Sequence, residues 1–203
     1  MFREILYPNQ EKIIRILSLF WKNFYLAGGT SIALQLWHRK SLDFDFFSFK
    51  KIDGNKIINI LKKEWYNISR ILVDNKWEEL TLIVDWVKLT FLYYPFEIKL
   101  ENEFEWIKLP SLNTLCAQKF YTLWRRWKWK DYVDIYYILK KFSNFSEISK
   151  LALSIFNWSY NEKLLREQLV YFEDIDYTEE VEFISKWASK SEIQDFLKKI
   201  AIS

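Results

Sequence analysis

The pattern of apolar and polar positions changes near residue 108, from mixed strand and helix spacings to a helical spacing that continues toward residue 203. Before this point, helical spacing predicts helices over residues 10–22, 30–37 and 53–65. Short apolar or β-branched runs bounded by turn residues predict strands over residues 24–27, 42–49, 69–74, 80–85, 87–94 and 97–100. The first part therefore has the alternating elements of a mixed sheet covered by helices.

The second part is expected to be helical throughout. Apolar positions recur at helical intervals and predict helices over residues 111–126, 130–140, 147–156, 162–172, 178–188 and 192–200. We therefore predict an α+β chain, with a mixed-sheet core over residues 1–108 and an α-helical region over residues 109–203.

Composition narrows the class of protein. Half of the residues are hydrophobic, which suffices for a sizeable core. Aromatic residues make up 20% of the chain and suit either that core, the simpler explanation, or stacking surfaces for bases. Cys116 is the single cysteine, so no internal disulfide forms and we expect a core position for it. Charges interrupt every apolar run, so we expect a cytoplasmic protein without a membrane segment. The net charge of +3 permits an acidic partner without requiring one.

Two adjacent glycines, Gly28 and Gly29, mark the end of the first predicted strand and the start of a helix. Glycine permits a sharp turn and leaves room for a phosphate to approach the backbone. The N–H groups at the start of the helix, together with the hydroxyls of Thr30 and Ser31, would add donors for that phosphate. A tight turn capped by Thr30 is the simpler explanation when the glycine pair is considered alone.

Asp43 and Asp45 lie two positions apart in the strand predicted over residues 42–49, so their side chains project from one face. Repulsion between two neighbouring carboxylates is relieved by a divalent cation, and Mg²⁺ is commonly held by one or two carboxylates with substrate phosphates. An edge strand with a solvated acidic face is the alternative. The apolar positions beside the two aspartates favour a strand that is buried on at least one side.

The glycine pair and the acidic pair reinforce each other. Gly29 and Asp43 are 14 residues apart, which is enough for one short helix and a turn. The second strand can then return beside the first, with the glycine turn and the acidic pair on neighbouring strands. We predict that a nucleoside triphosphate (NTP) rests on the turn and that a metal ion joins it to the carboxylates.

The spacing of these residues resembles the first motif of a known toxin family, through the run Gly28-Gly29-Thr30-Ser31 followed by Arg39-x-Ser41-x-Asp43-x-Asp45-Phe46-Phe47. The family is AbiEii/AbiGii, nucleotidyltransferase-fold proteins of bacterial abortive-infection and toxin–antitoxin systems. The resemblance implies a polymerase-β-like core in which the glycine turn holds phosphates and the two aspartates hold Mg²⁺, with Mn²⁺ as an alternative. By the same resemblance, Arg39 and Ser41 would bind phosphate or order the loop.

A second run is similar to a later motif of that family. Lys119 and Arg126 lie seven residues apart on one predicted helix, and Lys130-Asp131-x-x-Asp134 begins the next. A lysine and an arginine on one stripe suit a polyphosphate, and Asp134 would orient one of them or help to activate a nucleophile. The alternative is that these residues form ordinary ion pairs on a solvated face. That alternative explains Lys130 equally well. It explains Lys119 less well, because Lys119 lies within an otherwise apolar helix.

One departure from the nucleotidyltransferase pattern concerns a third carboxylate. Many of these enzymes carry it on a later central strand, and residues 87–91 look like that strand. Thr90 stands where the acid is expected, while Asp85 lies nearby in a predicted hairpin turn. His38, the only histidine, is expected at the surface, because it has no companions for a metal site.

These residues predict a Mg²⁺-dependent nucleotidyltransferase that acts as a toxin. Asp43, Asp45, Lys119 and Asp134 are its candidate catalytic residues. By resemblance, an RNA such as a tRNA end is the acceptor and an antitoxin protein is a partner. Two alternatives stay open: a nucleotide- or partner-binding module without turnover, which the missing acid at Thr90 favours, and a transferase that modifies a small molecule or a protein hydroxyl.

Overall fold

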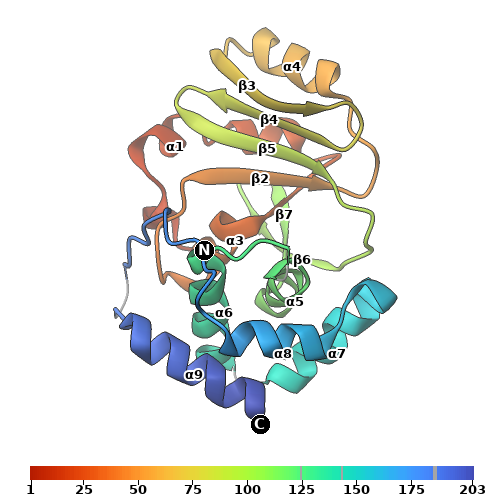
Figure 1. Cartoon of the computed structure of the whole chain (residues 1–203). Coiled ribbons are helices and arrows are strands. Elements are labelled where there is room, and N and C mark those ends of the chain that lie inside the picture. Colours follow the sequence, from red (N-terminus) through yellow and green to blue (C-terminus); the bar gives the residue numbers. More distant parts are fainter. Residues whose placement is uncertain (124, 143, 185–186) are drawn as a thin grey trace. The chain divides into compact units, whose positions relative to one another are not determined.

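The computed structural model describes residues 1–123, 125–142, 144–184 and 187–203. They form two compact units: residues 1–35 with 40–111, and residues 36–39 with 112–203. The first unit contains all seven strands and the second unit is helical (Figure 1). The predicted α+β class, with helices following a mixed sheet, is confirmed.

The first unit combines a sheet with short helices. Its elements, in chain order, are a 3₁₀ turn at Arg3–Ile5, α1 (Pro8–Lys12), α2 (Ile16–Phe20), β1 (Tyr25–Ala27), α3 (Gly28–Leu36), β2 (Asp43–Ser48), α4 (Gly54–Lys63), β3 (Ile68–Asn75), β4 (Glu79–Val84), β5 (Val87–Tyr93), β6 (Leu100–Phe104) and β7 (Ile107–Pro110).

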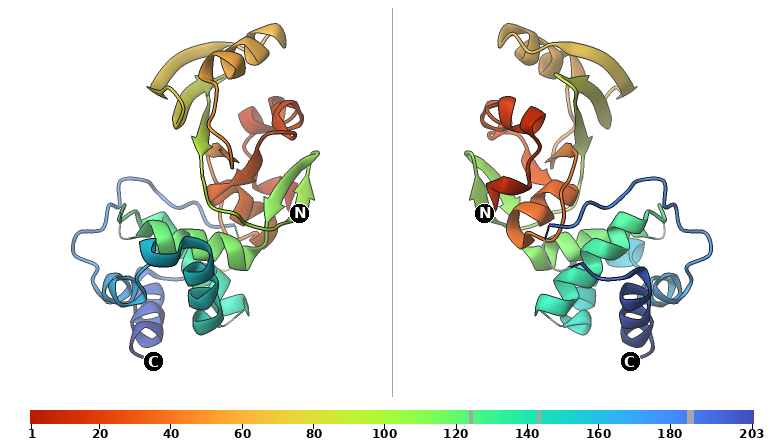
Figure 2. Two further views of the ribbon diagram at one scale, coloured as in Figure 1. Left: turned by 90° about the vertical axis from the view of Figure 1, so that its right-hand side faces the viewer. Right: turned by 90° about the vertical axis from the view of Figure 1, so that its left-hand side faces the viewer.

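The sheet has the strand order β3-β4-β5-β2-β1-β7-β6. The central strand β2 is antiparallel to β1 and parallel to β5, and β7 is parallel to β1. The remaining neighbours pair antiparallel as hairpins. At one edge, α4 packs along β3 (Figure 2), and the Asp53 carboxylate caps this helix by accepting from the Lys56 N–H.

Alternation along β2 fixes which side chains enter the core. Phe44, Phe46 and Ser48 are buried, while Asp43, Asp45 and Phe47 are only half-buried. The ring of Phe46 stacks on Phe91 of β5 at 4.7 Å between centroids, and Phe20 of α2 meets Phe91 edge-on at 4.8 Å. These contacts place three phenylalanine rings in the core, and they leave the two aspartates on the opposite face of the strand. Many tryptophans, such as Trp65 and Trp86, are exposed instead.

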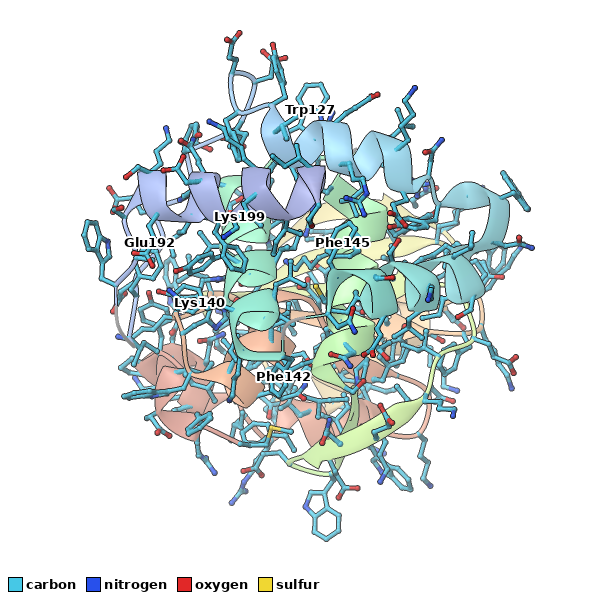
Figure 3. The ribbon with its side chains drawn as sticks, turned by 90° about the horizontal axis from the view of Figure 1, so that it is seen from below. Trp127, Lys140, Phe142, Phe145, Glu192 and Lys199 are labelled. Carbon is cyan, nitrogen blue, oxygen red and sulfur yellow. The ribbon has the colours of Figure 1, made fainter. Side chains whose placement is uncertain are left out.

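The helical unit contains α5 (Leu112–Leu123), α6 (Trp129–Phe142), α7 (Phe145–Phe156), a 3₁₀ turn at Asn157–Ser159, α8 (Glu162–Val170) and α9 (Lys190–Ile202). Helix α5 packs against α6, α7 and α8, and α9 packs against α6 and α8. Lys140 on α6 and Glu192 on α9 lie side by side and form an ion pair at 2.7 Å (Figure 3). Cys116 is buried in α5, as expected.

Several predicted elements differ in the structure. The helix predicted over residues 10–22 is two short helices, α1 and α2, and the strand predicted over residues 97–100 begins only at Leu100. Strand β7 was not predicted. The helix predicted over residues 178–188 is wrong for residues 178–184, 187 and 188, while residues 185 and 186 lie outside the described residues.

Backbone bonds to distant residues explain the missing helix. The Asp176 N–H donates to the Trp127 carbonyl, and the Ile184 N–H donates to the His38 carbonyl. Backbone groups that pair with other segments are not available for helical bonds, so tertiary pairing overrides the local pattern here. Within the part of the chain that is described, no helix has the length and apolar character needed to span a membrane.

Candidate active site

A glycine corner between β1 and α3 lies directly against the carboxylate of Asp45. Gly28 has φ +67°, in the left-handed region that favours glycine. A Cβ atom added to Gly28 would lie 1.9 Å from Oδ2 of Asp45. The antiparallel register pairs Ala27 with Asp45, which places the carboxylate at this corner. Only glycine leaves space for the carboxylate here.

The acidic pair shares one face of β2. Asp43 and Asp45 are both half-buried, and the residues on either side of Asp45, Phe44 and Phe46, are fully buried. Lys88 of β5 forms an ion pair with Asp43 at 2.6 Å. The Lys88 ammonium therefore compensates part of the negative charge on this face.

Strand β5 shows what stands beside each aspartate. In the parallel register, Lys88 is opposite Asp43 and Thr90 is opposite Asp45. Asp85 lies in the two-residue turn between β4 and β5, with φ +46°. Thr90, the position expected to carry a third acid, therefore places a hydroxyl-bearing side chain next to Asp45.

The Thr30 and Ser31 hydroxyls do not lie open to a ligand, contrary to the expectation that they donate to a phosphate. Both residues are fully buried. The Thr30 hydroxyl donates to the backbone carbonyl of Asp43, which ties the first turn of α3 to the start of β2. The Ser31 Oγ has no hydrogen-bond partner among the described residues. Thr30 thus supports the position of the acidic strand.

The donor set at this corner suits a magnesium ion that arrives with a triphosphate. Mg²⁺ prefers oxygen ligands and usually takes one or two carboxylates, with phosphate oxygens and waters completing its shell. Asp43 and Asp45 supply two carboxylates on one face, and the Asp45 carboxylate fills the space that the missing Cβ of Gly28 leaves. The described residues contain no group of three or more His, Cys, Asp or Glu side chains placed for a metal.

A second group of predicted residues converges on Asp134 within the helical unit. Arg39 donates to both of its oxygens, through Nε at 2.7 Å and Nη2 at 2.9 Å. Lys119 lies 2.8 Å from the second oxygen, and His38 Nε2 lies 2.7 Å from the first. Opposite charges in direct contact compensate the cost of burying Arg39, Lys119 and Asp134.

Asp131 extends this network by one helical turn. Its carboxylate is fully buried and pairs with Lys119 at 2.5 Å and with Arg126 at 3.1 Å. Arg126 is about half exposed, with 49% of its side chain accessible. Of Lys119, Arg126, Asp131 and Asp134, Arg126 is therefore the one whose side chain reaches solvent.

The electrostatics of the network argue against a proton-accepting Asp134. Burial alone would raise its pKa, but the charges of Arg39 and Lys119 and the bonds from His38 and Arg39 hold its pKa well below the ordinary 3.8. Four side-chain donors already surround the carboxylate, so it orients its partners. Arg39, expected to bind phosphate or to order the loop, donates from its guanidinium to Asp134.

His38 is a correction to the predicted surface position. It is fully buried, and burial lowers its pKa below the ordinary 6.5, against the raising effect of Asp134. The neutral ring therefore donates from Nε2 to Asp134. Its partner lies 96 residues further along the chain, so no local spacing indicated this contact.

The predicted residues thus fall into two groups. Gly28, Gly29, Thr30, Asp43 and Asp45 come together in the sheet unit, and half-buried Ser41 precedes this strand. Arg39, Lys119, Arg126 and Asp134 come together in the helical unit. Lys88 was missed as a member of the first group, although its position two residues before Thr90 on the predicted strand was a usable signal.

Comparison with known proteins identifies the protein family of this chain. The family model described as nucleotidyl transferase AbiEii toxin of type IV toxin–antitoxin systems matches residues 87–202, more than half of the chain. The chain belongs to this family. Its class of enzyme is accordingly nucleotidyltransferase. The AbiEii match includes Lys119, Arg126, Asp131 and Asp134 but not His38 or Arg39, and it begins after the acidic pair on β2.

Relatives of this AbiEii-family chain agree on its fold. An uncharacterized protein from Aquifex aeolicus strain VF5 is 28% identical over 209 residues, covering 97% of this chain and 96% of that protein. MenT4, a nucleotidyltransferase toxin from Mycobacterium tuberculosis H37Rv, has a TM-score of 0.59 at 15% identity, covering 94% of this chain and 80% of MenT4.

The Megavirus polyadenylate synthase has a TM-score of 0.50 at 17% identity over 66% of this chain. The match covers 31% of the synthase, so this chain spans about a third of the length of that protein. These low-identity likenesses confirm a nucleotidyltransferase-type sheet core.

Proposed function

We propose that this chain transfers a nucleotide from an NTP to an acceptor, with RNA such as a tRNA end as that acceptor and growth inhibition as the outcome. The observation that carries the proposal is the Asp45 carboxylate held against the Cβ-free corner of Gly28, with Asp43 on the same face. Membership of a type IV toxin family supports a cognate antitoxin as partner.

Each residue at the corner has a defined part in the proposed reaction. Gly28 leaves room for the Asp45 carboxylate, and Gly29 gives a phosphate chain access to the backbone N–H groups at the start of α3. Asp43 and Asp45 would hold Mg²⁺, which neutralises phosphate charge while pyrophosphate leaves. Lys88 compensates the charge of Asp43, and Thr30 fixes the backbone of Asp43. Positioning and charge stabilisation supply the rate enhancement.

Label transfer from an α-labelled NTP to total RNA tests the proposal, using the purified full chain with Mg²⁺. Asp45→Asn removes one metal-binding charge, so we expect the rate of transfer to fall by roughly 100-fold or more. Asp74→Asn is the matched control, because Asp74 is an exposed aspartate on the edge strand β3, and it should keep the wild-type rate. Equal rates for Asp45→Asn and wild type would refute the proposed metal site.

A nucleotide-binding module without turnover is the second candidate. The observation that favours it is Thr90, which lies opposite Asp45 where a third carboxylate would stand. The same reaction separates the two: saturable NTP binding without label transfer indicates the module. Label that appears in a product formed without RNA indicates a small-molecule or protein hydroxyl as the acceptor.

A further inference from the structure

Two lysines near the start of α6 converge on a single carboxylate. Lys128 donates to Oε1 of Glu179 and Lys130 donates to Oε2, so both carboxylate oxygens are occupied. The three side chains remain 33%, 20% and 39% exposed. The contact is therefore ionic but accessible, and a dissolved anion can compete for the two ammonium groups.

The carboxylate is carried by residues 176–184, which we call the strap. No residue of the strap belongs to a helix or to one of the named strands. Backbone bonds hold its two ends: the Asp176 N–H donates to the Trp127 carbonyl at 2.7 Å, and the Ile184 N–H donates to the His38 carbonyl at 3.0 Å. An irregular segment fixed at its ends can move its middle at a smaller cost than a helix can.

Two sets of ion pairs lie in this region. Lys128 and Lys130 pair with Glu179, while Arg39, Lys119 and Arg126 pair with Asp131 and Asp134. Asp131 and Asp134 are fully buried and occupied by other partners. Glu179 is the carboxylate that forms ion pairs with both lysines, although the charge of Asp176 also acts on Lys128. Withdrawal of Glu179 would break both ion pairs and let another anion bind the two ammonium groups.

Glu179 behaves as a permanent anion. Partial burial would raise its pKa, but the hydrogen bonds and charges of Lys128 and Lys130 lower the pKa to about 2. It therefore stays ionised throughout the neutral range and presents two oxygens to two ammonium groups. A phosphate group offers the same chemistry with more oxygens and more charge.

We infer that Lys128 and Lys130 form a phosphate-binding site that Glu179 fills as an internal substitute, so that the strap and a phosphate group compete for the same two lysines. This inference deepens the proposed function and rests on it for the source of the phosphate, which is either the NTP or the backbone of the acceptor RNA. The strap then sets how readily that phosphate is bound.

Calorimetric titration with inorganic tripolyphosphate, without divalent metal, tests the competition directly. Glu179→Gln removes the competing charge, so we expect tripolyphosphate to bind roughly tenfold more tightly than to wild type. Adding Lys130→Ala to that variant should abolish the gain. Glu180→Gln, at an exposed neighbouring position with the same change in charge, should bind like wild type.

Two results would overturn the inference: unchanged affinity in Glu179→Gln, or an equal gain in Glu180→Gln. Hydrogen exchange of the wild-type chain supplies a measurement that does not depend on any variant folding. Tripolyphosphate should speed the exchange of amides within the strap, and an unchanged rate there contradicts competition.

The source of the phosphate is separated by a second ligand. A 12-nucleotide oligouridylate should also gain affinity in Glu179→Gln if the site takes the RNA backbone, whereas a gain for tripolyphosphate alone indicates the NTP. The inference can fail while the proposed function holds. If label transfer depends on Asp45 but Glu179→Gln does not change phosphate binding, the chain is still a nucleotidyltransferase and the proposed phosphate site is refuted.

Discussion

At the scale of single residues, the site depends on an atom that glycine lacks. Gly28 places its Cα against the Asp45 carboxylate, in a backbone conformation that other residues adopt only with strain. Glycine is therefore favoured at this position for two independent reasons, the lack of space for a Cβ and the left-handed backbone. The backbone conformation favours glycine even if the carboxylate moves away.

Replacing Gly28 by alanine should consequently impair both folding and activity. The new Cβ would collide with Asp45 Oδ2, and the left-handed backbone adds about 1–2 kcal/mol of strain. We expect the urea midpoint to fall and label transfer to drop with it. Gly54→Ala is the matched control: its Cβ would meet Leu80 Cδ2 at 3.7 Å, an ordinary contact, so its midpoint should stay at or slightly above wild type.

Equal midpoints for the two alanine variants would contradict the close approach of Gly28 to Asp45.

The residues of this site differ in how far the sequence alone predicts them. Gly28 and the acidic pair follow from local spacing, because a strand that ends in glycine and a period of two are both local signals. The partners of Thr30 and His38 do not follow, since a backbone carbonyl 13 residues away and a carboxylate 96 residues away are set by the tertiary fold. Sequence spacing indicates which side chains share a face of an element, but it does not identify the residues that those side chains contact.

At the scale of elements, two hairpins end in turns of unusual composition. Asp85 and Trp86 join β4 to β5, and Glu105 and Trp106 join β6 to β7, with positive φ at all four residues. This is the geometry of a type I′ turn, which asparagine and glycine occupy most easily. Tryptophan at the second position therefore introduces backbone strain. Because the Trp86 side chain is 86% exposed, its burial contributes little free energy to offset that strain.

Trp86→Gly should stabilise the sheet unit. Glycine adopts φ +69° without strain, so we expect a gain of roughly 1 kcal/mol and a higher midpoint in thermal unfolding followed by circular dichroism. The comparison is Trp77→Gly in the turn before β4, where the exposed tryptophan does not have a positive φ. Glycine there adds only flexibility and should lower the midpoint. A fall of the same size in both variants would show that the turn is not strained.

Most elements follow from periodicity, and two of the exceptions, residues 178–184 and β7, share one cause. Strands β1 to β5 and helices α5 to α9 lie within a few residues of their predicted ranges, because their apolar faces are regular. Residues 178–184 have helical spacing but pair with distant backbone, and β7 has four residues and aligns with β1 at a single registered pair. A segment held by remote partners carries too little local signal to identify its structure.

At the scale of the whole molecule, the change in stability between pH 7.5 and pH 5.5 should originate mainly from one side chain. His38 is the only histidine of the chain, and its pKa lies below the ordinary 6.5 because it is buried. Below pH 6.5 the unfolded chain binds a proton at this residue that the folded chain does not bind, so stability falls as the pH falls through that value.

Urea unfolding at pH 7.5 and pH 5.5 measures this dependence. We expect the wild-type free energy of unfolding to be lower at pH 5.5 by about 1 kcal/mol. His38→Gln keeps a side-chain N–H for Asp134 but cannot be protonated, so its two values should agree closely. An undiminished pH dependence in His38→Gln would show that other groups cause it.

The assignment of residues 36–39 to the helical unit has a consequence for synthesis on the ribosome. These four residues emerge early, yet the carboxylate that receives His38 and Arg39 follows about 95 residues later. At translation rates of roughly 5–20 residues per second, the nascent chain carries an unanchored histidine and arginine for about 5–20 seconds. Maturation of the loop between the glycine corner and the acidic strand must therefore wait until α6 has left the exit tunnel.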